Sequence, residues 1–378
     1  MTQTTIEVTG ISVMPCLSKV FNSIMNNRLQ KYIDNGIINE AQIGFQPHSR
    51  TSDHMFVVRT LIDKFFSKGA KLYACFVDFD KAFDNVFHSV LLYKLCNIGI
   101  SGPFYNVIKC MYQSNLMHIK VKDKLTKAFS PQMGVRQGDN LSPNLFKMFV
   151  NDLPCLFDDD DDQVSLHDMK LSCLLYSDDL LLLSRTLTGL QNCLNKLLTY
   201  CENNGLIVNL KKTNIVTFCK SGKLSNEKYY FNKVEVMHVS RYKYLGIIFA
   251  SSGTFSYCQD DLYKRALKAS FKISKAFNQL HQNVDSIIHL FDHTIKPILL
   301  YSSEIWGIPN INSSIDRKTN YCLLNSFENM FCDKMHVKFL KYVLGVHKKA
   351  SNVAVCGELG RYSLFENSAL LLMCIYKM

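Results

Sequence analysis

Hydrophobic residues recur every three or four positions in several segments of the chain, a spacing that predicts amphipathic helices. In the first such segment they are Leu17, Val20, Phe21, Ile24, Met25 and Leu29, and the pattern ends near Asn35-Gly36. Similar patterns predict helices over residues 52–66, 85–97, 104–113 and 187–204. Beyond Gly253 the pattern is mostly helical.

Two shorter apolar segments predict strands that end in carboxylates. "KLYACFVDFD", residues 71–80, predicts a buried strand followed by Asp78, and "LLYSDDLLLLS", residues 174–184, predicts a hairpin with Asp178 and Asp179 at its tip. Between them, "HIKVKD" alternates like a strand, and "GVRQGDNLSPNLFKMFVNDL" predicts a loop and then a helix with Ser142 as N-cap. This order of elements predicts an α+β fold with a largely helical tail.

The adjacent carboxylates at the hairpin tip allow two interpretations. Ser and Asp are favoured in turns, so Ser177, Asp178 and Asp179 can form an ordinary polar turn. Alternatively, Asp78 and Asp178 project from one edge of an antiparallel sheet. Two such carboxylates can hold two Mg²⁺ ions about 3.5–4 Å apart, the arrangement that supports phosphoryl transfer.

Charge is distributed unevenly along the chain. The formal net charge is +11, which favours an anionic partner. The segment 205–250 contains only two acidic residues, Glu227 and Glu235, and eight basic ones, as expected for a strip that contacts phosphates. The basic residues are Lys211, Lys212, Lys220, Lys223, Lys228, Lys233, Arg241 and Lys243. The run of five acids at residues 158–162 predicts a solvated loop, because like charges repel.

The cysteines and the hydropathy argue against secretion and membrane insertion. No C-x-x-C pair occurs among the 14 Cys, and no signal segment is expected, so we predict reduced thiols. Cys322, Cys332, His336 and His347 have the residue types but not the spacing of a zinc knuckle. No apolar run reaches the roughly 18 residues of a transmembrane helix. We expect an intracellular protein that contacts no membrane.

Five motifs occur in an order and spacing that resemble a known family. "FVDFDKAFD", "GVRQGDNLSPNLF", "LLYSDD", "NLKKT" and "YKYLG" are similar to motifs A to E of the reverse transcriptases of non-LTR (LINE-type) retrotransposons. The resemblance implies a right-hand polymerase fold with fingers, a palm built on an antiparallel sheet, and a helical thumb. We expect fingers over 1–71, palm over 72–250 with a fingers insertion at about 91–131, and thumb and downstream region over 251–378.

The resemblance also implies roles for individual residues. Asp78, Asp178 and Asp179 match the carboxylates that bind two Mg²⁺ ions, which Mn²⁺ can replace. Lys212 matches the motif D lysine, either a general acid for pyrophosphate or a phosphate contact. Tyr244, Leu245 and Gly246 match the primer grip. The implied reaction is RNA-directed DNA synthesis, with an RNA template, a DNA primer and dNTPs as partners.

Further positions match the family's nucleotide site. Phe79, Asp80, Lys81 and Ala82 occupy the turn whose amides face the triphosphate, and Phe83 matches the steric gate that excludes a 2′-hydroxyl. Arg136, Gln137 and Gly138 match the loop against the templating base. Arg50 is the remaining basic candidate in the fingers, because Gln46 and Ser49 stand where the family has basic residues.

The sequence also departs from the family's pattern. Ser177 stands where Ala is usual, and Asp139 replaces a common Cys and adds charge beside the nucleotide site. We expect a piece of an element that lacks the endonuclease domain and the start of the fingers. A catalytically inactive nucleic-acid-binding remnant is the alternative, and Phe83 disfavours a third reading, an RNA-synthesising polymerase. Copying at a chromosomal target would require residence in the nucleus.

Overall fold

The computed structural model describes residues 12–47, 49–166, 168–224, 226–280, 283–307 and 331–364, with the backbone alone at 276–280. The chain divides into two compact units, Met1–Tyr242 and Lys243–Met378, each of which is described by itself. The predicted limits of fingers, palm and thumb remain predictions.

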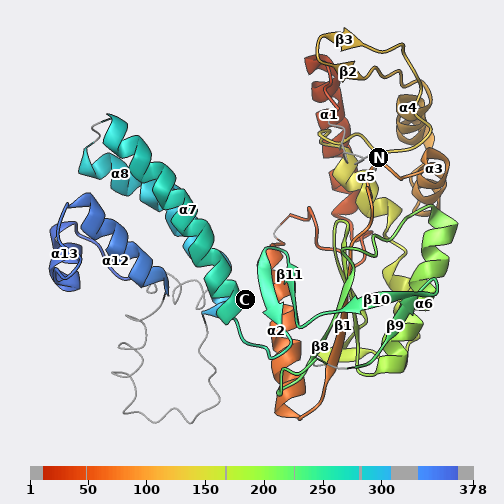
Figure 1. Ribbon diagram of the computed structural model, residues 1–378. Helices are drawn as coiled ribbons and strands as arrows, with labels where there is room; N and C mark the ends of the chain where they lie inside the picture. The colour runs from red at the N-terminus through yellow and green to blue at the C-terminus, as the bar shows by residue number, and fades with distance from the viewer. Residues whose placement is uncertain are drawn as a thin grey trace, which may run out of the picture. The chain divides into compact units, whose positions relative to one another are not determined.

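A six-stranded sheet organises the first unit (Figure 1). Its strand order is β6-β7-β1-β8-β10-β9, so the two acid-bearing segments of the sequence become neighbours. Two small hairpins, β2 with β3 and β4 with β5, lie outside it. The strands are β1 Leu72–Val77, β2 Lys120–Val121, β3 Lys124–Leu125, β4 Val164–Leu166, β5 Met169–Leu171, β6 Cys173–Tyr176, β7 Asp179–Ser184, β8 Asn214–Phe218, β9 Tyr229–Phe231 and β10 Val234–His238.

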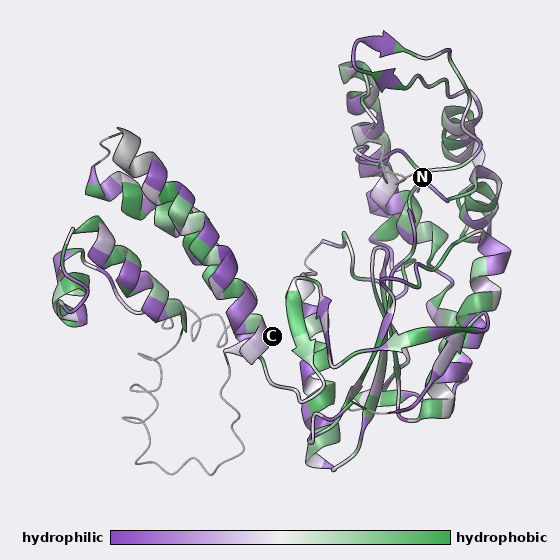
Figure 2. Ribbon diagram, in the orientation of Figure 1, coloured by the Kyte–Doolittle hydropathy of each residue, from purple (hydrophilic) through white to green (hydrophobic). Residues whose placement is uncertain are grey.

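The central strand β1 is buried along its whole length. Alternate side chains of a strand point to opposite faces, so both faces of the sheet must be covered here. Tyr73, Cys75 and Val77 join the main hydrophobic core, and α2 contacts β1 as well. Figure 2 shows the hydrophobic character of the central strands. This burial explains why the segment reads as a continuous apolar run rather than an alternating one.

Helices complete the first unit. They are α1 Cys16–Ile33, α2 Thr51–Ser67, α3 His88–Asn97, α4 Gly102–Gln113, α5 Ser142–Phe149, the 3₁₀ helix η1 Pro154–Phe157 and α6 Leu187–Asn204. Side chains of α1, α3, α4, α5 and α6 share one core with β1 and β7. The helix α6 ends at Gly205, whose φ of 72° is left-handed, as the Asn-Gly pair predicts.

Two predicted helix starts are wrong. The helix expected from residue 85 begins at His88; residues 80–85 form turns instead, and the Asp84 N–H donates to the Lys81 carbonyl. Ser142 is the first residue of α5 rather than its N-cap, which is Leu141. In both places the preceding loop extends further than the capping pattern suggests.

The second unit is largely helical, as predicted for the tail. The boundary between the units falls within β11 Arg241–Tyr244, which forms a hairpin with β12 Ile247–Ala250. The helices are α7 Ser256–Leu280, α8 Val284–Leu290, the π-helix η2 Phe291–Ile295, α9 Lys296–Leu299, α10 Ser303–Trp306, α12 Phe331–Val343 and α13 Asn352–Glu358. Their core includes Ala266, Phe291, Leu299 and Phe339.

Two predicted absences can be compared with the described residues. No helix in the described ranges combines the length and apolar character that a membrane crossing needs. Of the four residues with zinc-ligand chemistry, Cys322 lies outside the described residues. Cys332 and His336 are buried in the second unit, where the His336 ring stacks on Phe291 at 5.1 Å between centroids.

Candidate functional site

Strand register brings Asp78, Asp179 and Lys212 side by side. Val77 pairs with Leu180 across β1 and β7, so the next pair in the same register is Asp78 with Asp179. Phe76 pairs with Asn214 across β1 and β8, which sets Asp78 beside Lys212 two residues later. Directly paired residues project from the same face of a sheet. The three side chains therefore share one face at one end of β1.

Asp178 belongs to the tight turn between β6 and β7. Tyr176 pairs with Asp179, which leaves Ser177 and Asp178 as the two turn residues. Ser177 has a φ of 60°, a left-handed conformation that the small side chain tolerates. The hairpin predicted from "LLYSDDLLLLS" is thus present, and its turn adds Asp178 to the paired Asp78 and Asp179.

The surroundings of Asp178 and Asp179 disfavour the ionised form of both carboxyl groups. Burial, together with the negative charges of Asp178 and Asp78, raises the pKa of Asp179 to about 6. Burial likewise raises the pKa of Asp178, with Asp78 contributing in the same direction. Burial and mutual repulsion of this kind are typical of carboxylates at functional sites.

A divalent cation would suit the chemistry of these donors. In the described ranges no three His, Cys, Asp or Glu side chains converge as a complete metal-ligand set. Mg²⁺, however, is usually bound by one or two carboxylates together with water and substrate phosphates. Asp78 and Asp178 supply two hard oxygen donors. The pKa values of Asp178 and Asp179 are raised by burial and by neighbouring carboxylates, and a bound cation would oppose both effects.

The loop before β8 fixes the position of Asp78. The Asp78 N–H donates to the Thr213 hydroxyl at 3.1 Å, and the Asp78 carbonyl accepts from the Asn209 N–H at 2.8 Å. The Lys212 ammonium lies 3.7 Å from Asp78 Oδ2 while its side chain is 63% exposed. Lys212 can therefore reach both the acid cluster and a bound substrate.

A buried glutamine clamps the turn that carries Asp178. Gln42 has no exposed surface, and its Oε1 accepts from the Ser177 N–H at 3.0 Å while its Nε2 donates to the Ser177 carbonyl at 3.2 Å. Leu175 exchanges backbone hydrogen bonds with the flanking Ala41 and Ile43. A Cβ at Gly44 would lie 2.3 Å from the Ser177 nitrogen, so glycine is required there. The segment 41–44 thus holds the turn by direct contact.

The other end of this segment is tied to α5. Lys147 of α5 is fully buried and donates to the Phe45 carbonyl at 3.0 Å. Desolvation lowers the pKa of Lys147 to about 8, partly offset by Asp34. Phe45 has a φ of 56° and is 52% exposed. A strained, anchored backbone beside the carboxylates is typical of functional sites.

The turn after β1 offers fewer free amides than the resemblance implies. Phe79 is buried, and the Asp80 N–H already donates to the Ile207 carbonyl at 2.8 Å. The Asp80 N–H is therefore already used in a hydrogen bond within the protein and does not point to a triphosphate. Lys81 is exposed with a φ of 45°, and Ala82 is buried. The roles of Phe79, Lys81 and Ala82 remain predictions.

Phe83 is rigidly supported. Its ring stacks on Phe146 of α5 with centroids 4.7 Å apart, and its carbonyl accepts from the Val135 N–H at 2.8 Å. A bulky side chain held between two elements is suited to exclusion by shape. The steric-gate role itself remains a prediction.

The loop before α5 is bound to protein groups. Arg136 donates to the Met111 carbonyl of α4 at 3.1 Å, and Gln137 donates to Asp84 at 3.3 Å. Gly138 has a φ of 96°, which requires glycine. Asp139 is buried and accepts from Asn22 of α1 at 2.8 Å, so it points into the protein and our expectation of added charge beside the nucleotide is wrong.

The remaining predicted residues lie further along the chain. Arg50 is exposed at the start of α2, where its backbone N–H donates to Asp53. Tyr244 is buried, and Leu245 and Gly246 form the β11–β12 turn with φ values of 46° and 90°. In the same unit the Tyr301 hydroxyl donates to the Leu245 carbonyl at 2.9 Å. The primer-grip segment is thus a well-supported turn of the second unit.

Sequence reasoning missed three supporting residues. Gln42 and Thr213 hold the backbones of Ser177 and Asp78. Thr213 is the last residue of the motif "NLKKT", but the sequence indicated no role for it. Tyr242 stacks on Phe76 at 4.5 Å, and burial followed by the charges of Asp179 and Asp78 raises its pKa to about 12. A Gln two residues before Gly44 was the available signal for Gln42. The positions of Thr213 and Tyr242 follow only from the pairing of the strands.

Comparison with known proteins agrees with this geometry. A family model described as "Reverse transcriptase (RNA-dependent DNA polymerase)" matches residues 8–249. The probable RNA-directed DNA polymerase from transposon BS of Drosophila melanogaster is 26% identical over 84% of this chain and 35% of the relative. The polymerase from the mobile element jockey, of the same species, is 26% identical over 79% and 33%.

A third relative and a solved structure extend the comparison. The Pol polyprotein from the R2 retrotransposable element of Nasonia vitripennis is 26% identical over 64% of this chain and 24% of its own length. Telomerase from Candida albicans, in complex with a TWJ fragment of telomeric RNA, is similar in fold: the TM-score is 0.50 at 13% identity, over 89% of this chain and 58% of that one.

These matches confirm the resemblance to non-LTR retrotransposon enzymes and the α+β polymerase fold. The chain spans about a third of the length of the first two relatives. With a family match over most of its length, the chain belongs to the reverse transcriptase (RNA-dependent DNA polymerase) family.

Proposed function

We propose that this chain is the polymerase core of a retrotransposon reverse transcriptase, which extends a DNA primer with dNTPs on an RNA template. The observation that carries the proposal is the register that pairs Asp78 with Asp179 beside the Asp178 turn. Two carboxylates on one sheet face with a third on the adjoining turn are best explained by the cations of phosphoryl transfer.

Asp78 and Asp178 would hold two Mg²⁺ or Mn²⁺ ions, with Asp179 as a weaker ligand or an orienting group. The ions would activate the primer 3′-hydroxyl and neutralise charge on the transferred phosphate. The chain's own contribution is alignment. Gln42 fixes the Asp178 turn, and Thr213 and Asn209 fix Asp78.

Lys212 is placed to act on the leaving pyrophosphate. Its ammonium reaches Asp78 at 3.7 Å and remains largely exposed. It would either donate a proton to the pyrophosphate or stabilise its negative charge. Both actions suit a flexible cation at the edge of the acid cluster.

Nucleotide selection would rest on Phe83, whose supported ring would clash with a 2′-hydroxyl. Lys81 and the amides of Phe79 and Ala82 would face the triphosphate, with Arg50 as the basic residue of the fingers. Gln137 and Gly138 would lie against the templating base.

The expected division of the chain follows from these roles. Residues 1–71 would form fingers, 72–250 the palm with an insertion at about 91–131, and 251–378 the thumb and downstream region. Tyr244, Leu245 and Gly246 would position the primer end. Copying into chromosomal DNA would take place in the nucleus.

A nucleic-acid-binding protein without catalysis is the second candidate. Two observations favour it. The Asp80 N–H donates a hydrogen bond to the Ile207 carbonyl, and the Arg136 guanidinium donates one to the Met111 carbonyl. Groups expected at the nucleotide are therefore bound elsewhere. Such a protein would bind template–primer in a salt-sensitive manner but retain no nucleotide when Mg²⁺ is added.

Primer extension separates the two candidates. The intact chain and Asp178→Asn are incubated with a DNA primer on an RNA template, Mg²⁺, and either dNTPs or rNTPs. Extension with dNTPs that disappears in Asp178→Asn supports the polymerase. Absence of extension from a folded protein that binds template–primer supports the second candidate, and equal use of rNTPs contradicts the role of Phe83.

A further inference from the structure

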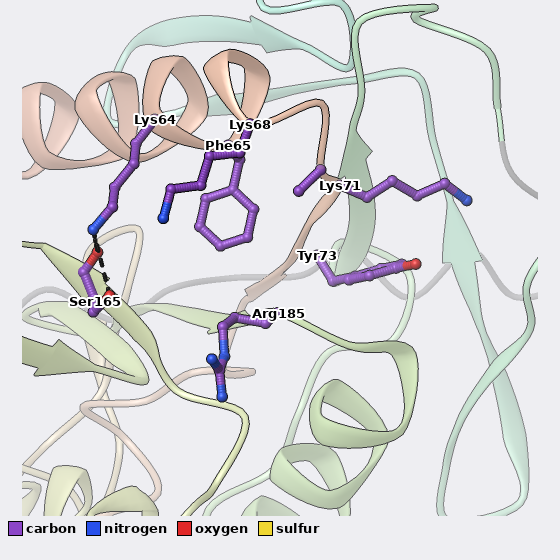
Figure 3. Close-up of a pocket in the computed structure, with 8 residues that line it drawn as sticks. Lys64, Phe65, Lys68, Lys71, Tyr73, Ser165 and Arg185 are labelled. Carbon is purple, nitrogen blue, oxygen red and sulfur yellow. Dashed lines mark hydrogen bonds between the residues drawn. The ribbon is translucent and has the colours of Figure 1, made fainter.

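A second charged feature lies at the opposite end of β1 from the carboxylates. A cavity of about 400 Å³ is lined by the end of α2, the start of β1, β4 and the residue after β7 (Figure 3). Lys71 precedes β1 and Asp78 follows it, so about 23 Å of extended strand separates this cavity from the acid cluster. The cavity is therefore distinct from the candidate active site.

Three cations of this cavity have no carboxylate partner. Lys64, Lys68 and Arg185 form no ion pair among the described residues, whereas Lys71 pairs with Glu227 at 3.3 Å. Figure 3 shows Lys71 pointing away from Lys64 and Lys68, which extend beside the Phe65 ring. The cavity thus carries uncompensated positive charge above an aromatic floor.

Two of the cations are held in place by neutral acceptors. Lys64 Nζ donates to the Ser165 carbonyl at 2.6 Å, across 101 residues of sequence. Arg185 donates to the Asp161 carbonyl, and its backbone N–H donates to the Asp162 carbonyl at 3.0 Å. The Asp162 carboxylate accepts from Thr186 instead. Side chains held in this way lose little entropy when an anion binds.

Helix electrostatics explain only part of this cluster. Lys64 and Lys68 lie at the C-terminal end of α2, where the helix dipole favours cations. Arg185 lies two residues before α6 begins, where the dipole disfavours a cation. Its position beside two lysines of another element is better explained by an anionic ligand.

We propose that this cavity binds phosphate groups of a single-stranded nucleic acid, as a contact separate from the acid cluster. Its cations match the phosphates of a nucleic-acid backbone. The size is that of a small ligand site, which fits one nucleotide unit of a longer strand. The partner class rests on the proposed function, but the site needs no catalysis.

The test measures binding of a fluorescent single-stranded RNA by anisotropy, without Mg²⁺ or dNTPs, over a range of salt concentrations. We compare the intact chain with the double variant Lys68→Gln, Arg185→Gln. The matched control is Lys31→Gln, Lys109→Gln, which removes the same charge from exposed residues of the same unit that lie outside both the cavity and the basic segment 205–250. Lys68→Arg tests rescue, and Lys68→Glu tests charge reversal.

The cavity variant should bind about tenfold more weakly, and the slope of log K against log salt should fall by about 1.4. The control should change less than twofold, Lys68→Arg should bind normally, and Lys68→Glu should bind more weakly than the intact chain. Equal losses in both double variants would overturn the proposal. The proposal would also be overturned if inorganic phosphate bound at the cavity while the cavity variant kept the RNA affinity of the intact chain. That result would assign the cavity to a small anion. Because no step of synthesis is measured, a protein that fails in primer extension can still pass this test.

Discussion

Two groups of carboxylates in the first unit differ in how their charge is compensated. The acid run at 158–162 has protein partners: Asp160 accepts from Lys196 at 2.5 Å, and Asp162 accepts from Thr186, the N-cap of α6, at 2.8 Å. Asp78, Asp178 and Asp179 have one ion pair among the described residues, between Asp78 and the exposed Lys212 at 3.7 Å. They repel one another instead.

The difference shows that acid density alone does not identify a metal site. Within the run of five acids, Asp162 is bonded to the N-cap hydroxyl of α6 and Asp160 to Lys196 of the same helix, so both have donors from the protein. In contrast, strand pairing and the β6–β7 turn bring Asp78 together with Asp178 and Asp179 from another segment. Their one ion pair among the described residues is between Asp78 and Lys212. A site for cations is indicated by this deficit, and the following predictions test it.

Removing one acid from each group should have opposite consequences. Asp178→Asn should reduce primer extension at least about 10³-fold, because a metal ligand is lost. Without metal it should increase the free energy of unfolding, because repulsion is relieved. Asp160→Asn should leave extension intact and cost about 1 kcal/mol of stability through Lys196. Extension assays and urea denaturation measure both effects; equal loss of activity in the two variants would remove the distinction.

Loosening the turn beneath Asp178 should produce an intermediate effect. Gln42→Met removes both hydrogen bonds to Ser177 while keeping a similar volume. We expect extension to fall by about 10–100-fold, with a larger effect on kcat than on the KM for dNTP. Gln46→Met is the matched control, because Gln46 contacts the Gln42 carbonyl but not the turn. An unchanged kcat in a folded Gln42→Met protein would contradict the positioning role.

The acid cluster should also leave a signature in the pH dependence of stability. The folded pKa of Asp179 is about 6, raised by burial and by Asp178 and Asp78, and the unfolded value is about 3.9. Between these values the folded protein binds more protons, so Asp179 makes the free energy of unfolding fall as pH rises from about 4 to 6. Urea denaturation in EDTA should show this slope reduced in Asp179→Asn. An identical slope in both proteins would show that Asp179 titrates normally.

The smallest effect is expected at the acid run's helix contact. Thr186→Ala removes the hydroxyl that accepts from the Gly189 N–H and donates to Asp162. We expect a loss of about 1 kcal/mol in stability and no change in extension. A large loss of extension, measured at a temperature where the variant is folded, would show that this region contributes to activity.

Much of this architecture is predictable from the sequence, because β1, the acid hairpin and α6 have strong local patterns. The helix starts at residue 85 and Ser142 were not, since turns and loops of the surrounding fold displaced the expected starts. Family resemblance located Asp78 and Asp178, but Gln42 and Thr213 act through contacts 135 residues distant in sequence. The inward turn of Asp139 likewise depends on Asn22 of a distant helix.

The central claim is that the cluster of Asp78, Asp178 and Asp179 binds catalytic divalent cations. Its most direct test is the number of Mn²⁺ ions bound, measured by electron paramagnetic resonance with template–primer and a non-reactive dNTP analogue. We predict two ions for the intact chain and for Asp160→Asn, and fewer for Asp178→Asn. Equal Mn²⁺ binding by all three proteins would contradict the account.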